Sequence, residues 1–132
     1  GIPIYGKAPA GLAATFGGYE HGVAEDDRYL PRSLYPDDPD AFAVFVHGDC
    51  MTPEFRNGDL VIVSPGASLQ DGDVCYFRLN DGHDADNGVK RFFRRDDDRI
   101  ELVPDNRAYR PRIVPEDALA RVGKVVGKYV RY

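Results

Sequence analysis

The sequence predicts an all-β domain built mainly of antiparallel strands. Short runs rich in β-branched and aromatic residues recur along the chain, and several alternate apolar with polar positions, as strands with one buried face do. Turn-forming residues separate these runs, and the 14 glycines and 10 prolines suit many short strands better than long helices. At 132 residues the chain is long enough for one domain with its own core, and too short for two.

Six runs in the later part of the chain are expected to be strands. The first, AFAVFVHG, is rich in valine and phenylalanine, and the second, DLVIVSP, is a compact apolar run that ends at Pro65. Between these two, the letters TPEF suggest one short helical turn. Turns rich in Asp and Gly separate the later runs. The six runs cover residues 41–48, 59–65, 72–79, 88–95, 99–104 and 121–132.

The pattern is weaker before residue 40. Residues 2–6, IPIYG, are a candidate strand, but KAPAGLAATFGGYEHG is rich in small residues and YLPRSLYPDDPD is punctuated by proline. A long segment of this kind ahead of a compact core is often functional in small domains. We therefore divide this single domain, residues 1–132, into an N-terminal segment, residues 1–40, and a core, residues 41–132.

The composition excludes several classes of protein. The formal net charge is −5 and the pI is near 5.1, whereas a domain that binds nucleic acid through the phosphate backbone is normally basic. No apolar run is long enough to span a membrane and no signal peptide is visible, so we expect a cytoplasmic protein without a membrane partner. The chain begins at Gly1 rather than at methionine, so we expect a processed form or part of a longer polypeptide.

The two cysteines, Cys50 and Cys75, follow no zinc-binding spacing and imply no disulfide, so we expect neither a metal nor another cofactor. Cys50 lies between an apolar run and a turn, where a thiol could act as a nucleophile. A histidine is one candidate partner. His47 is three residues away, on the opposite face if both residues lie in a strand, and His21 and His83 lie in loops without a supporting pattern.

Lys90 is another candidate partner for the thiol. It stands in GVKRFF among apolar neighbours, and such surroundings disfavour the charged form of a lysine. A neutral amine can act as general base toward a hydroxyl or a thiol. The alternative is that Lys90 is a solvent-facing strand residue beside three arginines, and the residues alone leave both interpretations open.

The stretch VHGDCMTPEFRNGDLVIV resembles the nucleophile segment of the LexA and phage-repressor family of self-cleaving proteins, peptidase family S24. That segment usually reads G-D-S-M-x-P, followed by G-D and an apolar strand. The resemblance continues in order through DGDVCYFRL, GVKRFF and IELVPDNRAYRP, the last of which is similar to the family's L-x-P-x-N-x-x-Y-x-P stretch. VGKVVGKYV is similar to the closing strand, and IPIYGKAPAG to the strand and Ala-Gly cleavage site ahead of the core. The resemblance covers residues 2–130 and implies the fold of a LexA-like C-terminal domain.

The resemblance implies roles for individual residues. Cys50 takes the place of the nucleophile and Lys90 that of the general base. Ala10-Gly11 lies where the family cuts its own chain, and small residues on both sides let an extended loop enter a narrow cleft. The backbone N–H groups of Cys50 and Met51 are candidate donors to the oxyanion that forms during the attack.

Two points of the resemblance stay open. The usual nucleophile is serine, so Cys50 is a natural thiol variant that cuts, a natural variant that has lost cutting, or an engineered replacement. Ala13-Ala14 and Gly17-Gly18 are further bonds between small residues, and the alternative is that the whole stretch is a linker.

For the whole protein, the resemblance implies a transcriptional repressor of the SOS or phage type, with this chain as its regulatory and dimerisation domain. A homodimer would present two N-terminal helix-turn-helix domains, presumed absent from this chain, to operator DNA. A RecA filament is the implied co-protease. The closing strand, residues 124–132, is a candidate dimer contact because its alternation suits an edge; an interior strand is the alternative. Alternative functions are a UmuD-like polymerase-accessory protein and a cleavage-dead dimerisation module.

Overall fold

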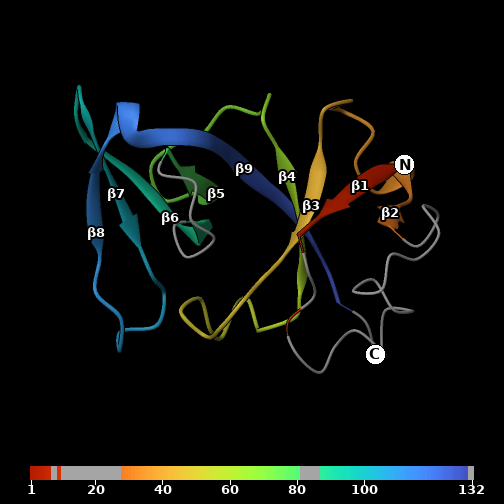
Figure 1. The fold of residues 1–132 in the computed structure, drawn as a ribbon, viewed down its shortest axis with the longest axis horizontal. Helices are drawn as coiled ribbons and strands as arrows, with labels where there is room; N and C mark the ends of the chain where they lie inside the picture. Colours follow the sequence, from red (N-terminus) through yellow and green to blue (C-terminus); the bar gives the residue numbers. More distant parts are fainter. Residues whose placement is uncertain (7–8, 10–27, 81–86, 131–132) are drawn as a thin grey trace.

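The computed structural model describes residues 1–6, 9, 28–80 and 87–130, and nearly all of its regular structure is β-strand (Figure 1). The all-β prediction is confirmed. Within these ranges the only helical elements are two short 3-10 helices, η3 (Arg32–Leu34) and η5 (Glu116–Ala118). The strands are β1 (Ile2–Tyr5), β2 (Tyr29–Leu30), β3 (Phe42–Phe45), β4 (Leu60–Ser64), β5 (Val74–Leu79), β6 (Asn87–Asp96), β7 (Arg99–Val103), β8 (Arg112–Pro115) and β9 (Leu119–Tyr129).

One mixed sheet contains all the described strands, in the order β2-β1-β3-β4-β9-β5-β6-β7-β8. β1 runs parallel to β3, and every other neighbouring pair is antiparallel. Seven of these strands lie in runs that the sequence predicts. β2 and β8 were not expected. β2 has only two residues. β8 is short, three of its four residues are exposed and a proline ends it, so neither burial nor alternation marks it.

β9 joins the two halves of the sheet. Residues 119–124 pair with β5, and residues 124–129 pair with β4 (Figure 1). The expectation of an edge strand was therefore wrong, and β9 is an interior strand of the monomer. The apolar side chains of β9 pack against two different clusters, Val126 against the first and Val125 against the middle one, so their pattern in the sequence does not mark an edge. From Val125 onward, β4 is the only described strand that pairs with β9.

A glycine allows β9 to lie close to β4. A Cβ atom at Gly123 would lie 2.7 Å from Val63 Cγ1 and 3.3 Å from the Ser64 carbonyl oxygen. Real Cβ atoms essentially never approach another heavy atom as closely as the first of these distances. Any other residue at this position would therefore require the Val63 side chain or one of the two strands to shift.

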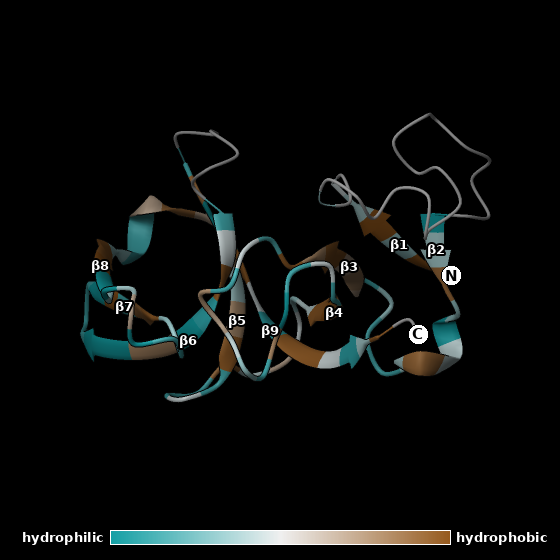
Figure 2. Ribbon diagram, turned by 90° about the horizontal axis from the view of Figure 1, so that it is seen from below, coloured by the Kyte–Doolittle hydropathy of each residue, from teal (hydrophilic) through white to brown (hydrophobic). Residues whose placement is uncertain are grey.

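The core consists of three apolar clusters along the sheet. The first contains Ile2 and Ile4 of β1 with residues of β2, β3 and β4, and the third fills the space among β5, β6, β7 and β8. The middle cluster lies against β3, β4 and β5 and includes Met51 and Phe55, which are 0% and 5% exposed. Figure 2 shows the apolar stretches of β1, β3 and β9 along this layer. The connection between β3 and β4 is thus anchored in the core by two side chains.

The letters TPEF form hydrogen-bonded turns rather than a helix. The Phe55 N–H donates to the Met51 carbonyl at 2.9 Å, and the Thr52 N–H donates to the Asp49 carbonyl at 3.2 Å. The described ranges contain no helix with the length and apolar content that a membrane crossing requires.

Candidate active site

The candidate nucleophile lies in the connection between β3 and β4, residues 46–59, which we call the Cys50 loop. The loop is closed at its base, where the Val46 N–H donates to the Asp59 carbonyl at 2.8 Å and the Gly58 N–H donates to the Val46 carbonyl at 2.7 Å. Gly58 has a φ of 94°, in the left-handed region that favours glycine. The loop therefore returns the chain directly into β4 with its two ends fixed.

Cys50 and Lys90 meet at one end of this loop. Lys90 Nζ donates a hydrogen bond to Cys50 Sγ at 3.0 Å, although the two residues are 40 positions apart in the sequence. Both side chains are half-buried, Cys50 in its loop and Lys90 in β6. An amine at this distance can accept the thiol proton or pair with the thiolate, which is the geometry that a nucleophile and its general base require.

The surroundings of Lys90 are largely apolar. Its Nζ lies 5.9 Å from the centroid of the Phe77 ring, and the residue directly across the sheet on β5 is the fully buried Cys75. Burial raises the pKa of the Cys75 thiol to about 12, against the opposing influence of the Lys90 charge and backbone. Cys75 therefore stays a neutral thiol near pH 7, and Cys50 is the accessible one of the two free cysteines.

A second segment, Asp105–Tyr109, lies across the Cys50 loop, and we call it the strap. Asn106 makes three of its hydrogen bonds. The Asn106 N–H donates to the Cys50 carbonyl at 3.0 Å, and Asn106 Nδ2 donates to the Asp49 carbonyl at 3.1 Å and to Thr52 Oγ1 at 3.4 Å. A single residue thus contacts both carbonyl groups on either side of the Cys50 α-carbon.

Other strap residues add to this contact. The Tyr109 hydroxyl donates to the Asp49 carboxylate at 2.5 Å, and this hydrogen bond raises the pKa of Tyr109 above its usual value of 10. The Asp105 N–H donates to Met51 Sδ at 3.4 Å, while the Asp105 carboxylate pairs with Arg91 Nε at 3.1 Å. Because Arg91 follows Lys90 in β6, the strap touches the Cys50 loop and the strand of Lys90 at once.

The two candidate oxyanion donors are available. Among the described residues, no acceptor is hydrogen-bonded to the backbone N–H of Cys50 or of Met51. The Met51 side chain is fully buried in the middle apolar cluster, so it anchors the backbone of the loop to the core at this point. Fixed N–H groups with no acceptor in the described part of the chain suit the stabilisation of a developing negative charge.

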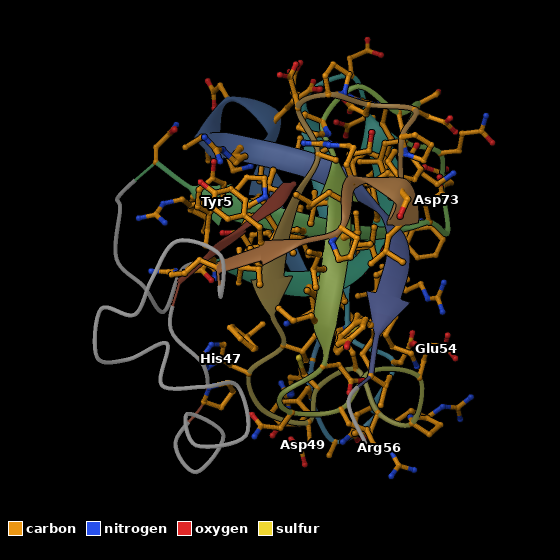
Figure 3. The ribbon with its side chains drawn as sticks, turned by 90° about the vertical axis from the view of Figure 1, so that its right-hand side faces the viewer. Tyr5, His47, Asp49, Glu54, Arg56 and Asp73 are labelled. Atoms are coloured by element: carbon orange, nitrogen blue, oxygen red, sulfur yellow. The ribbon has the colours of Figure 1, made fainter. Side chains whose placement is uncertain are left out.

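The remaining sequence-predicted residues lie elsewhere. His47 is exposed, and Figure 3 shows it at the same end of the molecule as Asp49, Glu54 and Arg56. The hydrogen-bond partner that the structure gives to Cys50 Sγ is Lys90, not His47. Among the described residues, no three His, Cys, Asp or Glu side chains are placed to hold a metal ion. Ala10, Gly11, His21 and His83 lie outside the described residues, as do Ala13, Ala14, Gly17 and Gly18.

Sequence reasoning assigned no role to Asn106 and Tyr109. The stretch IELVPDNRAYRP stood out only by its similarity to the family's L-x-P-x-N-x-x-Y-x-P stretch. The available signal was the spacing itself, in which an amide and a phenol lie three positions apart in a turn that Pro104 and Pro111 bound. The pattern gave no indication that this turn contacts a loop more than 50 residues earlier.

Known proteins give a consistent picture. Residues 3–126 match the Peptidase S24-like family. The chain is 37% identical over 129 residues to the LexA repressor of Geotalea uraniireducens, a match that covers 96% of this chain and 59% of that protein. It is 35% identical over 129 residues to the LexA repressor of a Geobacillus species, covering 97% and 58%, and 40% identical over 89 residues to that of Oleidesulfovibrio alaskensis, covering 66% and 41%.

The chain thus spans less than two thirds of the length of these curated relatives. The family match extends across almost all of the described residues, from β1 to β9, and includes both the Cys50 loop and the strap. The chain therefore belongs to the Peptidase S24-like family.

Proposed function

We propose that this chain is the regulatory and dimerisation domain of a LexA-like transcriptional repressor, and that it cuts its own backbone between Ala10 and Gly11. The observation that carries the proposal is the 3.0 Å contact between Cys50 Sγ and Lys90 Nζ in a chain of this family. Neither side chain has another catalytic partner among the described residues, and the Cys50 thiol is partly open to solvent.

The reaction proceeds in two steps. Lys90 takes the proton from the Cys50 thiol, and the sulfur attacks the carbonyl carbon of Ala10. The carbon–nitrogen bond to Gly11 then breaks, and the Lys90 ammonium gives its proton to the departing amine. Water next attacks the thioester, which releases the Ala10 carboxylate and restores the thiol. Water is the only other reactant in these steps.

Two structural features favour this chemistry. The cleavage segment belongs to the same chain as the nucleophile, so its effective concentration is high even if the catalytic pair is modest. The backbone N–H groups of Cys50 and Met51 have no acceptor among the described residues, and can donate to the oxygen of Ala10 as it becomes negatively charged.

The regulatory role follows from cutting ahead of the core. In a homodimer, two N-terminal helix-turn-helix domains bind the two halves of an operator together, and the joint affinity far exceeds that of either alone. Cleavage removes the covalent link between these domains and the dimerising core, so the affinity for operator DNA falls once the two parts separate. A RecA filament would act by favouring the position of the loop in which cleavage occurs, without adding catalytic groups. The part of β9 after Val125, which pairs only with β4 among the described strands, is the proposed dimer contact.

The test is self-cleavage of the purified chain. The neutral fraction of a lysine amine rises with pH, so incubation at mildly alkaline pH should release a fragment that ends at Ala10, detected by intact mass. Cys50→Ala should stay intact under the same conditions. A native chain that stays intact both at alkaline pH and with an activated RecA filament would contradict the proposal and leave a dimerisation module.

A further inference from the structure

We propose that Asn106 is a positioning residue that orients the two backbone N–H groups expected to stabilise the oxyanion. The inference rests on the proposed function in one respect, namely that Cys50 attacks a carbonyl carbon. It assigns a role to the strap, which the nucleophile and base alone do not need. Two features support this role: the carbonyl groups to which Asn106 donates hydrogen bonds, and the planarity of the peptide group.

Asn106 holds two consecutive peptide groups. Its side chain donates to the carbonyl of Asp49, in the peptide group that contains the Cys50 N–H, at 3.1 Å. Its main chain donates to the carbonyl of Cys50, in the peptide group that contains the Met51 N–H, at 3.0 Å. Both peptide groups are trans, because the only cis bond among the described residues is the one between Thr52 and Pro53.

In a planar trans peptide group the C=O and N–H bonds point in opposite directions. Since Asn106 holds both carbonyl groups on the side of the strap, the N–H groups of Cys50 and Met51 are both directed away from the strap. No described residue accepts a hydrogen bond from either of them. Asn106 therefore sets the direction of both N–H groups at once, and an oxyanion hole requires donors that are fixed before the charge develops.

The strap itself is held by groups outside the Cys50 loop. The Asp105 carboxylate accepts from Arg91 Nε at 3.1 Å and from Arg91 Nη2 at 3.3 Å, and Arg91 Nη1 donates to the Gly72 carbonyl at 3.0 Å. These residues belong to β6 and to the turn before β5. Asn106 is thus fixed to the strand that carries Lys90. The two backbone N–H groups and the Lys90 amine are therefore held by the same part of the sheet.

The Asp49 carbonyl also accepts two hydrogen bonds from inside the loop, from the Thr52 N–H at 3.2 Å and from Thr52 Oγ1 at 3.0 Å. These local bonds shape the turn but do not tie it to the rest of the domain. In the described part of the chain, Asn106 is the residue outside the loop that donates to these two carbonyl groups, and its neighbour Asp105 links it to Arg91 of β6. Loss of its side chain should therefore loosen the direction of the Cys50 N–H while the turn persists.

The experiment compares two reactions at the same sulfur. Acetyl transfer from p-nitrophenyl acetate proceeds through an oxyanion: the carbon–sulfur bond forms, the ester carbon–oxygen bond breaks and p-nitrophenolate leaves. Alkylation by iodoacetamide displaces iodide at a saturated carbon and forms no oxyanion. The ratio of the two rates at Cys50, measured by peptide mass, therefore reports the oxyanion donors separately from the reactivity of the thiol. Neither reaction requires the chain to cut itself.

The variants are Asn106→Ala and the nearly isosteric Asn106→Asp, whose carboxylate cannot donate to the Asp49 carbonyl. Both keep the main-chain bond to Cys50. Arg107→Ala, an exposed strap position, is the matched control. Removal of a whole oxyanion donor costs about 10²- to 10³-fold, so release of one donor's direction should slow acetyl transfer about tenfold. Alkylation should stay within about twofold of the native rate, since it needs no oxyanion donor.

Thermal unfolding of each variant shows whether it is folded, and Asn106→Asp serves if the alanine variant is not. The inference is overturned if acetyl transfer and alkylation fall in parallel, or if neither changes in a folded variant. Failure of the proposed function looks different. A native chain that is acetylated at Cys50 but never cuts itself would exclude self-cleavage and still give the acetyl-to-alkyl ratio that tests Asn106.

Discussion

Substitution of Lys90 is the most direct test of the proposed self-cleavage chemistry. Lys90→Met keeps an unbranched side chain of similar length against Phe77 but removes the amine that lies 3.0 Å from Cys50 Sγ. A positioned general base contributes about 10²- to 10⁴-fold to a rate. A thiol is more acidic than a hydroxyl and depends less on its base. We therefore expect Lys90→Met to slow self-cleavage by about a hundredfold at neutral pH, near the lower end of that range.

The effect should grow when oxygen replaces sulfur. A serine hydroxyl hardly ionises on its own, so in a Cys50→Ser background the loss caused by Lys90→Met should approach about 10⁴-fold. The assay follows the first-order appearance of the N-terminal fragment by intact mass in four chains: native, each single variant and the double variant. Because added hydroxide can replace the base for a thiol, the loss in the cysteine background should also shrink as the pH rises.

Lys124→Met is the matched control. Lys124 lies across the sheet from Cys75 on β9, as Lys90 does on β6, and pairs with Asp73 at 3.5 Å. It should keep the native rate of self-cleavage. The reasoning is refuted if Lys90→Met cuts as fast as the native chain, or if Lys124→Met loses as much activity, because the loss would then reflect the charge of the domain rather than a base at the sulfur.

Three further predictions concern reactivity and stability. Because burial raises the pKa of Cys75 to about 12, iodoacetamide at mildly alkaline pH should label Cys50 and leave Cys75 unmodified, as peptide mass mapping would show; equal labelling would contradict this. The hydrogen bond that Asp38 accepts from Ser64 at 2.6 Å lowers the pKa of the Asp38 carboxyl below 3.8, so the stability it confers is present above that value and lost as the pH falls through the folded-state pKa. Asp38→Asn should remove this part of the acid dependence in urea unfolding, and an unchanged pH profile would count against it. Gly123→Ala would place a methyl group 2.7 Å from a side-chain carbon of β4, so it should lower the free energy of unfolding by about 1–3 kcal/mol in the same assay. No loss would mean that the Val63 side chain or the strands can move aside without cost.

The sequence predicts the strands where apolar runs are dense. The run DLVIVSP becomes β4, which is buried along its whole length, and GDVCYFRL becomes β5, which is buried at four of its six positions. β8 was not predicted because only one of its four residues is buried. Local pattern could not decide whether β9 is an edge or an interior strand, because the partner on each side comes from a distant part of the chain.

The pairing of Cys50 with Lys90 was expected from a family resemblance, not from periodicity. No local rule brings together two residues 40 positions apart; the fold does so by bringing the connection between β3 and β4 against β6. The contacts of Asn106 were missed for the same reason. Two of its three hydrogen bonds to the Cys50 loop involve backbone carbonyls, whose positions depend on the fold and leave no trace in residue type.

The position of β1 in the sheet has a consequence for any cut downstream of it. Ile2 and Ile4 are 0% and 3% exposed, β1 pairs with β2 and with β3, and Arg28 Nη2 donates to the carbonyl of Ile4 at 2.9 Å. If the chain were cut between Ala10 and Gly11, these non-covalent contacts would still hold the upstream fragment, which contains β1, to the domain. Under the proposed function, release of an N-terminal DNA-binding domain would then require a second event, the separation of β1 from β2 and β3, and the slower of the two events would set the rate of derepression.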